Sequence, residues 1–306
     1  MKRLLIKTAL LIITSVSILS IIMLLTKDNY SLYSHEQNVA LAYNRLKALS
    51  DTNKIVIIAG SNGSFSINSH MIAQAFQMPV INTSTHAGIG VRMQFEIYKE
   101  LLHKGDIVIF CPEYDSGKSR LYGGSTLFRI LTTHMPQAYR KVSLKQWLFI
   151  FKYIGVHYSV TLGHLSAKDY EGPYSAHSLN KYGDIECKRL HQDSIKTPEL
   201  EGKMDEELIT YYKYIHSYSK DNGIKLVFLP PTFNWSSYKK NEKQIDSIAF
   251  CLKQNGIPYQ ASTIRYTFPD SLYFDTPYHM IQSGANKRTA MLIEDLERIL
   301  SINIDK

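Results

Sequence analysis

The 306-residue chain has only three cysteines, Cys111, Cys187 and Cys251, and they are far apart in the sequence. No CxxC pair or zinc-type ligand spacing is present, so neither a metal site nor a disulfide framework is predicted. Cys111 lies in an apolar run and Cys251 on a probable helix face, where each is expected to be a small buried residue. Internal repeats and low-complexity segments are also absent. Nothing in the sequence indicates a cofactor, and none is predicted.

Blocks of one charge are missing as well. Lys and Arg outnumber Asp and Glu by 35 to 27, giving a net charge of +8, but the basic residues are scattered. This pattern argues against a nucleic-acid-binding protein and favours a mildly basic surface suited to anionic lipid or glycan. Gly117-Lys118-Ser119 resembles the end of a phosphate-binding loop. The glycine that such a loop needs at position 112 is Pro112, so this motif is rejected.

One long apolar run is present, over residues 8–26. As a helix, its 19 residues would span about 28 Å, close to the hydrocarbon thickness of a bilayer. Basic residues precede the run, which predicts a cytoplasmic N-terminus and a body outside the inner or plasma membrane. The run is longer than a usual signal-peptide core and has no obvious cleavage site, so residues 1–27 are predicted to be a retained single-pass anchor. A cleaved signal would put the body in the same extracytoplasmic compartment.

Beyond this run, predicted strands alternate with predicted helices. A polar stalk with an amphipathic helix occupies residues 28–53. Strands are predicted at 55–58, 79–82, 106–111, 224–229 and 257–260. Helices are predicted at 66–76, 91–103, 204–222, 236–254 and 283–300. The alternation predicts one α/β domain over residues 54–300, with a right-handed, doubly wound parallel sheet.

The alternation stops between residues 115 and 203. This stretch is rich in glycine, proline and aromatic residues, with at most short helices near 125–133 and 144–151. Connections of this length usually have a function of their own, so we predict a lid or substrate-shaping insertion above the sheet.

The first predicted strand ends abruptly in Gly60-Ser61-Asn62-Gly63, which presents a hydroxyl at its carboxyl end. Ligands bind at this edge of open α/β sheets, so Ser61 is the first candidate nucleophile. A simpler interpretation is that Ser61 and Asn62 only form a turn and cap the next helix.

A serine nucleophile needs a base, and the base needs a partner that fixes its tautomer. Asp275 and His279 lie on either side of Pro277, in a loop that leads into the last predicted helix. In the predicted sheet this loop reaches the same edge as Ser61. The chain therefore contains a candidate triad in the order Ser, Asp, His.

Several candidate residues could instead have purely structural roles. His279 could simply cap the last helix, and His86 could be a loop histidine with satisfied hydrogen bonds. Glu113 could form a structural ion pair with Arg92 or Arg120.

Several segments resemble motifs of the SGNH/GDSL hydrolase-like superfamily. They are AGSNGSF at 59–65, NTSTHAGIG at 82–90, PEY at 112–114 and FDTPYHMIQSGANKRT at 274–289. NKYGD at 180–184 also resembles a segment in the insertion of such proteins. The similarity covers the core but not the stalk or most of the insertion, and it points to membrane-anchored envelope members similar to D-alanyl transfer and alginate O-acetylation proteins. It implies a flavodoxin-like three-layer sandwich with a parallel sheet.

Matched by position, the resemblance implies Ser61 as nucleophile, His279 as base and Asp275 as the acid that orients the base. The family builds its oxyanion hole from the nucleophile's own N–H, a backbone N–H in the second motif and an Asn side chain in the third. Ser84 stands where the second motif usually has glycine, and its N–H can still donate. The third motif here has Pro112-Glu113-Tyr114 where Gly-x-Asn-Asp is usual, and losing one oxyanion donor typically costs about a hundredfold or more in rate.

Other residues are candidates to replace the missing donor. Asn62 and Asn82 have suitable side chains, and a residue of the lid is a further possibility. Gly88 and Glu113 complete the expected oxyanion and substrate-binding set. The acid and base are four residues apart, where three is commoner in the family.

These features together predict an extracytoplasmic, membrane-anchored serine esterase or O-acyltransferase that modifies an envelope or exported polysaccharide through an acyl-enzyme. The expected partners are an acylated glycan or acyl donor and a membrane-bound O-acyltransferase, with no nucleic acid. The rival is a non-catalytic glycan-binding or assembly factor that keeps the fold, which the altered third motif favours. A lipid- or phosphoester-active hydrolase of the same fold is less well supported, because no metal-ligand cluster accompanies the serine.

Overall fold

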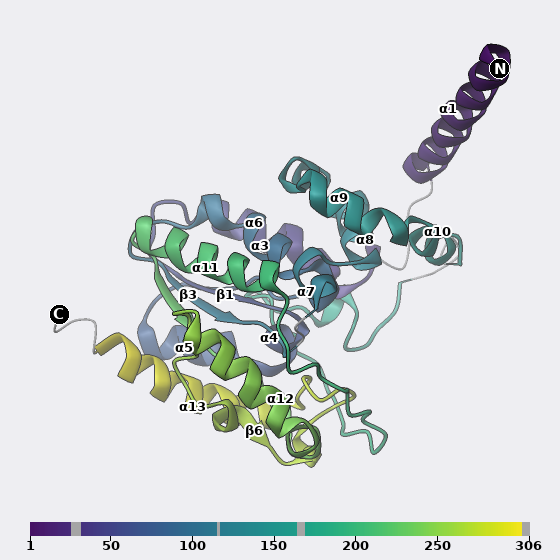
Figure 1. Cartoon of the computed structure of the whole chain (residues 1–306). Coiled ribbons are helices and arrows are strands. Elements are labelled where there is room, and N and C mark those ends of the chain that lie inside the picture. Colours follow the sequence, from purple (N-terminus) through teal and green to yellow (C-terminus); the bar gives the residue numbers. More distant parts are fainter. Residues whose placement is uncertain (26–31, 115–116, 164–168, 302–306) are drawn as a thin grey trace.

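The computed structural model describes residues 1–25, 32–114, 117–163 and 169–301 (Figure 1). At its centre lies a parallel sheet of four strands in the order β2-β1-β3-β4. The strands are β1 (Ile55–Ala59), β2 (Val80–Asn82), β3 (Ile107–Cys111) and β4 (Lys225–Phe228). Every residue of β1 and β3 is buried, which explains why both are continuous apolar runs. The order is that of a doubly wound sheet, as predicted.

Helices cover both faces of this sheet, because successive side chains of a strand point to opposite sides. Val56 and Ile58 belong to one core, with α3 (Asn38–Ala48), α6 (Val91–Glu96), α11 (Glu206–Asp221) and α12 (Trp235–Gln254). Ile55 and Ile57 belong to the other core, with α5 (Ser69–Phe76) and α13 (Gln282–Ser301). The α/β prediction with a parallel sheet is confirmed, and the layers are compatible with a three-layer sandwich (Figure 1).

The predicted fifth strand at 257–260 is wrong. Pro258 lacks the N–H that a sheet ladder requires, and only Gln260 donates a backbone hydrogen bond to Phe228 of β4 (2.9 Å). The side-chain oxygen of Gln260 accepts the Phe228 N–H at 3.1 Å, in place of a backbone carbonyl. A separate pair of short parallel strands forms instead, β5 (Phe233–Asn234) and β6 (Thr267–Phe268).

The helix predictions are most accurate where the apolar periodicity extends over many residues. The helices predicted at 204–222, 236–254 and 283–300 correspond to α11, α12 and α13. The one predicted at 66–76 corresponds to α5, which begins at Ser69 and follows a short helix that was not predicted, α4 (Ser61–Ser66). The one predicted at 91–103 ends early, after α6. The predicted insertion contains α7 (Lys118–Tyr122), α8 (Ser125–Thr133), α9 (Leu144–Ile150) and α10 (Ile154–Gly163). Of these, α8 and α9 were expected.

The N-terminal run forms a helix, α1 (Lys2–Leu25), which Figure 1 draws apart from the body. Within the residues that the structure describes, no helix combines the length and the apolar character that a bilayer crossing requires. The predicted transmembrane helix is therefore not supported.

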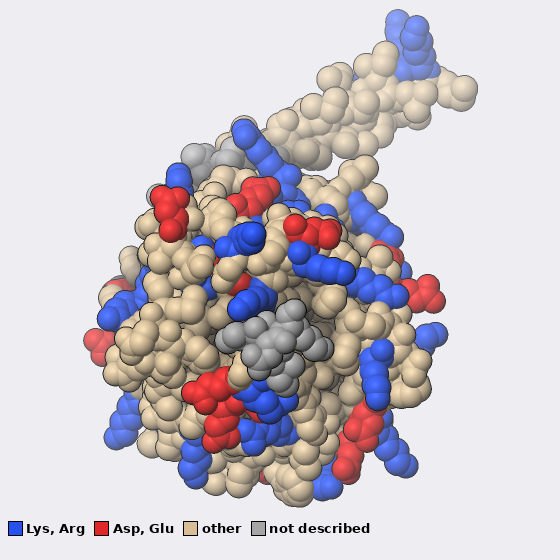
Figure 2. Space-filling view, turned by 90° about the vertical axis from the view of Figure 1, so that its left-hand side faces the viewer, with Lys and Arg blue, Asp and Glu red and all other residues tan. Residues whose placement is uncertain are grey.

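Charged side chains are mixed in sign on the side of the molecule drawn in Figure 2. Lys and Arg alternate there with Asp and Glu, and neither sign forms a large continuous patch. This agrees with the scattered basic residues of the sequence.

Candidate active site

Ser61 is the first residue of α4 and follows β1 with only Gly60 between them. The structure thus places its hydroxyl at the carboxyl end of the sheet. The Oγ of Ser61 donates a hydrogen bond to Oε1 of Glu113 at 3.4 Å. A Cβ at Gly60 would lie 2.6 Å from the same oxygen, so glycine allows the close approach of Glu113.

Asp275 and His279 form the hydrogen-bonded pair that the sequence predicts. Nδ1 of His279 lies 2.9 Å from Oδ1 of Asp275, and His279 is buried. The Tyr174 hydroxyl donates to Oδ2 of Asp275 and lies 3.2 Å from Nδ1 of His279. Burial raises the pKa of Asp275, but the hydrogen bond and charge of His279 and the hydrogen bond of Tyr174 outweigh it, so the pKa is below its usual value.

Helix α4 links the serine to the histidine. Phe65, four residues after Ser61 and so one helical turn along, stacks on the ring of His279 with 4.1 Å between ring centroids. Ser66 accepts the N–H of Met280 at 3.2 Å, which holds the histidine loop against the helix. In the described part of the chain, however, no hydrogen bond joins Ser61 to His279. The serine is paired with Glu113 instead, and Nε2 of His279 makes no hydrogen bond to the described residues.

Ser84 and Asn82, two predicted oxyanion donors, serve to brace α4. The Ser84 N–H donates to Oδ1 of Asn82 at 3.1 Å, and the Asn82 amide donates to Gly63 at 3.1 Å and to Asp184 at 2.8 Å. A Cβ at Gly63 would lie 2.1 Å from Oγ of Ser84, so the serine in the usual glycine position packs directly on the helix. Among the described residues, neither of the two makes a hydrogen bond to Ser61.

The remaining candidates are also engaged. The side chain of Asn62 donates to the carbonyl of Cys111 at 3.1 Å, and the Gly88 N–H donates to Nδ1 of His86 at 2.9 Å. The backbone N–H of Asn62 is different, because it donates to the Glu113 carboxylate at 3.4 Å. A change of rotamer at Glu113 would release this N–H without disturbing the backbone.

Glu113 forms an ion pair with Arg120, which is one of the two structural pairings that the sequence suggests. One of its oxygens lies 3.5 Å from Nη1 of Arg120, and the two side chains are 11% and 2% exposed. Arg92, the other partner considered, lies 4.0 Å from Glu96. Glu113 also lines a cavity of about 260 Å³ between the loops that follow β2 and β3 and the insertion. The site therefore offers an open pocket lined by a carboxylate and a buried guanidinium, and Ser61 is hydrogen-bonded to that carboxylate.

Sequence analysis missed the contributions of Tyr174 and His35. Tyr174 comes from the insertion and His35 from the stalk, and the two segments meet where Ser34 and Ser175 form an antiparallel bridge. The His35 ring lies edge-on to Phe65 and to Tyr174, and its Nδ1 is 3.2 Å from the Tyr174 carbonyl. No motif marks either residue, since their role arises only from contacts between distant segments.

Burial of His35 predicts a loss of stability in acid. Burial lowers its pKa from 6.5 to about 4, although the charge of Glu36 opposes this. The unfolded chain binds a proton below pH 6.5 that the folded chain takes up only near pH 4, so stability falls across this window, by up to about 1.4 kcal/mol per pH unit. Urea unfolding at several pH values from 4 to 7 gives the free energy of unfolding as a function of pH. This free energy should change less steeply with pH in His35→Asn than in His70→Asn, the control at an exposed site. Equal pH dependence in the two variants would contradict the prediction.

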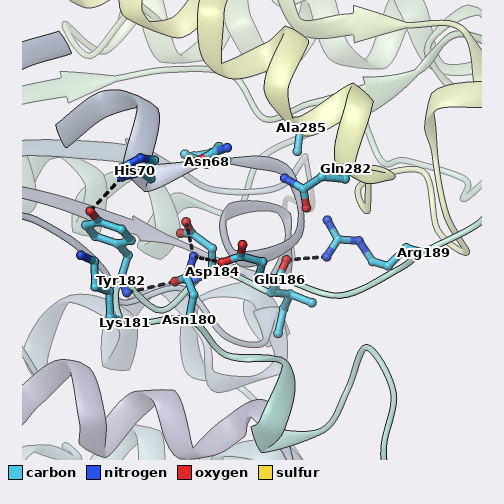
Figure 3. A pocket seen from close by; sticks show the side chains of 12 residues that line it. Asn68, His70, Asn180, Lys181, Tyr182, Asp184, Glu186, Arg189, Gln282 and Ala285 are labelled. Carbon is cyan, nitrogen blue, oxygen red and sulfur yellow. Dashed lines mark hydrogen bonds between the residues drawn. The ribbon is translucent and has the colours of Figure 1, made fainter. Parts of the chain in front are cut away.

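A second cavity, of about 460 Å³, contains none of the predicted site residues (Figure 3). It lies between the starts of α5 and α13 and the loop at 180–189, with the polar side chains Asn68, Tyr182 and Gln282 in its wall. Asp184, also in this wall, is buried and accepts the Ser69 N–H at 2.8 Å, which ties the loop to the start of α5. The segment at 180–184 thus supports the neighbouring helix.

In the ranges that the structure describes, no group of three or more His, Cys, Asp or Glu residues could hold a metal ion. All three cysteines are free; Cys111 is buried as expected, whereas Cys251 is only partly buried.

The chain matches no family model and no curated protein. The resemblance to the SGNH/GDSL superfamily stays a prediction from the motifs.

Proposed function

We propose that the chain is an SGNH-type serine esterase or O-acyltransferase acting on an envelope or exported polysaccharide. The observation that carries the proposal is the hydrogen-bonded pair of Asp275 and His279, joined by Tyr174 of the insertion, on a loop tied to α4, the helix that begins with Ser61. Nucleophilic acyl transfer requires a histidine that is oriented by a carboxylate and can reach a serine, and this pair is held against the helix that carries the serine.

In the proposed reaction, Ser61 Oγ leaves Glu113 and gives its proton to Nε2 of His279 as it attacks the acyl carbonyl. Asp275 keeps the proton of His279 on Nδ1 and stabilises the imidazolium. The oxyanion takes hydrogen bonds from the backbone N–H groups of Ser61 and Asn62 once Glu113 has moved. The imidazolium protonates the leaving group, and an ester forms at Ser61. Water or a sugar hydroxyl then attacks this ester, with His279 as base, which restores the serine.

One observation favours the non-catalytic alternative. The Glu113 carboxylate accepts hydrogen bonds from both Ser61 Oγ and the Asn62 N–H. The other predicted oxyanion donors take part in structural hydrogen bonds. A glycan-binding or assembly factor would tolerate this arrangement, because it needs no oxyanion hole.

Labelling with a fluorophosphonate probe distinguishes the two functions. The full chain is expected to be labelled, and Ser61→Ala is expected to lose the label completely, because the probe reacts with an activated serine. Ser119→Ala is the matched control, since Ser119 lines the same cavity as Glu113 but makes no hydrogen bond to His279 within the part of the chain that the structure describes. Absence of labelling in folded wild-type protein would sink the enzyme proposal and support the binding factor.

A further inference from the structure

Helices α9 and α10 carry large apolar side chains on their outer surface. Leu144 and Leu148 of α9, and Phe151 in the 3-10 turn that follows α9, are 75%, 73% and 64% exposed, and Val156 and Leu162 of α10 are 49% and 53% exposed. The spacings of four and three residues place the first three on one side, about one turn apart. We call these five residues the outer face.

The opposite side of the same helices is already packed. Gln146, Ile150 and His157 are buried, and the Trp147 ring stacks on Tyr139 with 5.7 Å between centroids. The helices are therefore held by their inner side and are apolar on the outer side as well. A helix that is apolar all round is normally buried, and an exposed apolar patch of this kind marks an interaction surface.

The surrounding charge indicates what this surface contacts. Residues 117–163 include seven Lys and Arg residues and no Asp or Glu, in a chain whose net charge is +8. Five of the seven pair with carboxylates of other segments: Arg120, Arg129 and Lys141 have one partner each, and Lys145 and Lys118 share a single carboxylate, Glu207. Arg140 and Lys152 are exposed and have no carboxylate partner in the described ranges. The rim of the outer face thus keeps a positive excess, which comes from these two residues and from the two lysines that share one carboxylate.

We propose that the outer face rests on the surface of an anionic lipid bilayer. Apolar side chains enter the boundary between headgroups and acyl chains, while the lysine and arginine heads reach the anionic headgroups. Lys152 is exposed, and its ammonium group lies 4.2 Å from the centroid of the Phe149 ring, so a cation and apolar side chains are neighbours on this surface. Pairing with a second copy is less favourable, because it would bring two basic rims together.

This surface adjoins the candidate active site. Tyr153, which lies between α9 and α10, lines the same 260 Å³ cavity as Glu113. A bilayer under the outer face would bring a membrane-borne acyl donor close to the cavity beside Ser61. The lipid contact itself does not depend on Ser61 being catalytic, so the two proposals can fail separately.

Hydrogen exchange followed by mass spectrometry tests the contact locally. The full chain is mixed with vesicles of phosphatidylcholine containing one quarter phosphatidylglycerol, and amide exchange over residues 144–162 is compared with that of the free protein. We expect exchange there to slow about tenfold or more on the anionic vesicles, with the effect reduced by high salt. Unchanged exchange would overturn the proposal, and equal protection by pure phosphatidylcholine would overturn the role given to charge.

A matched pair of variants separates the outer face from any other attachment. Leu148→Glu combined with Phe151→Glu should abolish the protection, because it places two acids in the contact. Phe250→Glu is the control, since Phe250 is 62% exposed on α12, in a different part of the chain. Protection that survives the double variant would contradict the proposal. Protection that grows with protein concentration in the absence of vesicles would identify a second copy as the partner and equally overturn it.

Discussion

Replacing His279 with alanine is expected to slow acylation of Ser61 about a thousandfold or more, while the fold is kept. The loss follows from removing the imidazole that is oriented by a carboxylate and held against α4, through Asp275 at 2.9 Å and the Phe65 ring at 4.1 Å. Asp275→Asn should cost nearly as much, because the asparagine amide cannot stabilise the imidazolium and favours the wrong tautomer. The measurement is the second-order rate of fluorophosphonate labelling at neutral pH.

Tyr174→Phe should have a much smaller effect, about tenfold, because the carboxylate keeps its bond to His279 when the hydroxyl is lost. His70→Ala serves as the control, since His70 is exposed and contacts Tyr182 instead of the triad. An unchanged labelling rate in His279→Ala would rule out this histidine as the base. It would leave Glu113, the group that Ser61 contacts, as the base to be tested.

The parts of this protein that could be predicted are those that leave a local pattern. Buried parallel strands are continuous apolar runs, which is why β1 and β3 were placed almost to the residue. The predicted strand at 257–260 also starts with an apolar residue, but Pro258 has no N–H to donate to a sheet ladder. The prediction followed the apolar start and did not take this proline into account. Parallel topology then brings Ser61 and the loop of Asp275 and His279 to one edge.

The contacts that decide how the site works leave no such pattern. Tyr174 donates a hydrogen bond to Asp275, although the two residues are 101 positions apart in the sequence. The Asn82 side chain accepts the Ser84 N–H because of the local conformation of the loop. Residue types alone made Asn62, Asn82, Ser84 and Gly88 reasonable oxyanion donors. Only the three-dimensional arrangement reveals that the side-chain amides of Asn62 and Asn82 and the N–H groups of Ser84 and Gly88 are engaged. The pairing of Ser61 with Glu113 in place of His279 was likewise invisible, because it depends on a close approach over Gly60.

Replacing Glu113 with glutamine is expected to accelerate labelling of Ser61 about a hundredfold. The carboxylate now accepts hydrogen bonds from Ser61 Oγ and the Asn62 N–H, each at 3.4 Å, so it occupies donors that a developing oxyanion would need and repels that charge. A glutamine keeps the size of the side chain, removes the charge and adds an amide that can donate. It thereby supplies the kind of side-chain donor that the third motif of the resembled family provides.

Glu113→Asp is the matched control, because it keeps the charge with a shorter side chain and should bring no comparable gain. Loss of the ion pair with Arg120, which is 2% exposed, will lower the stability of the glutamine variant, so its melting temperature must be measured alongside the rate. The direction of the rate change separates two roles for the same carboxylate. Acceleration means that Glu113 holds the serine in an inactive pairing and must move before His279 can act. A slower rate in both Glu113 variants would mean that the carboxylate itself takes the proton, and the assignment of His279 as base would be wrong.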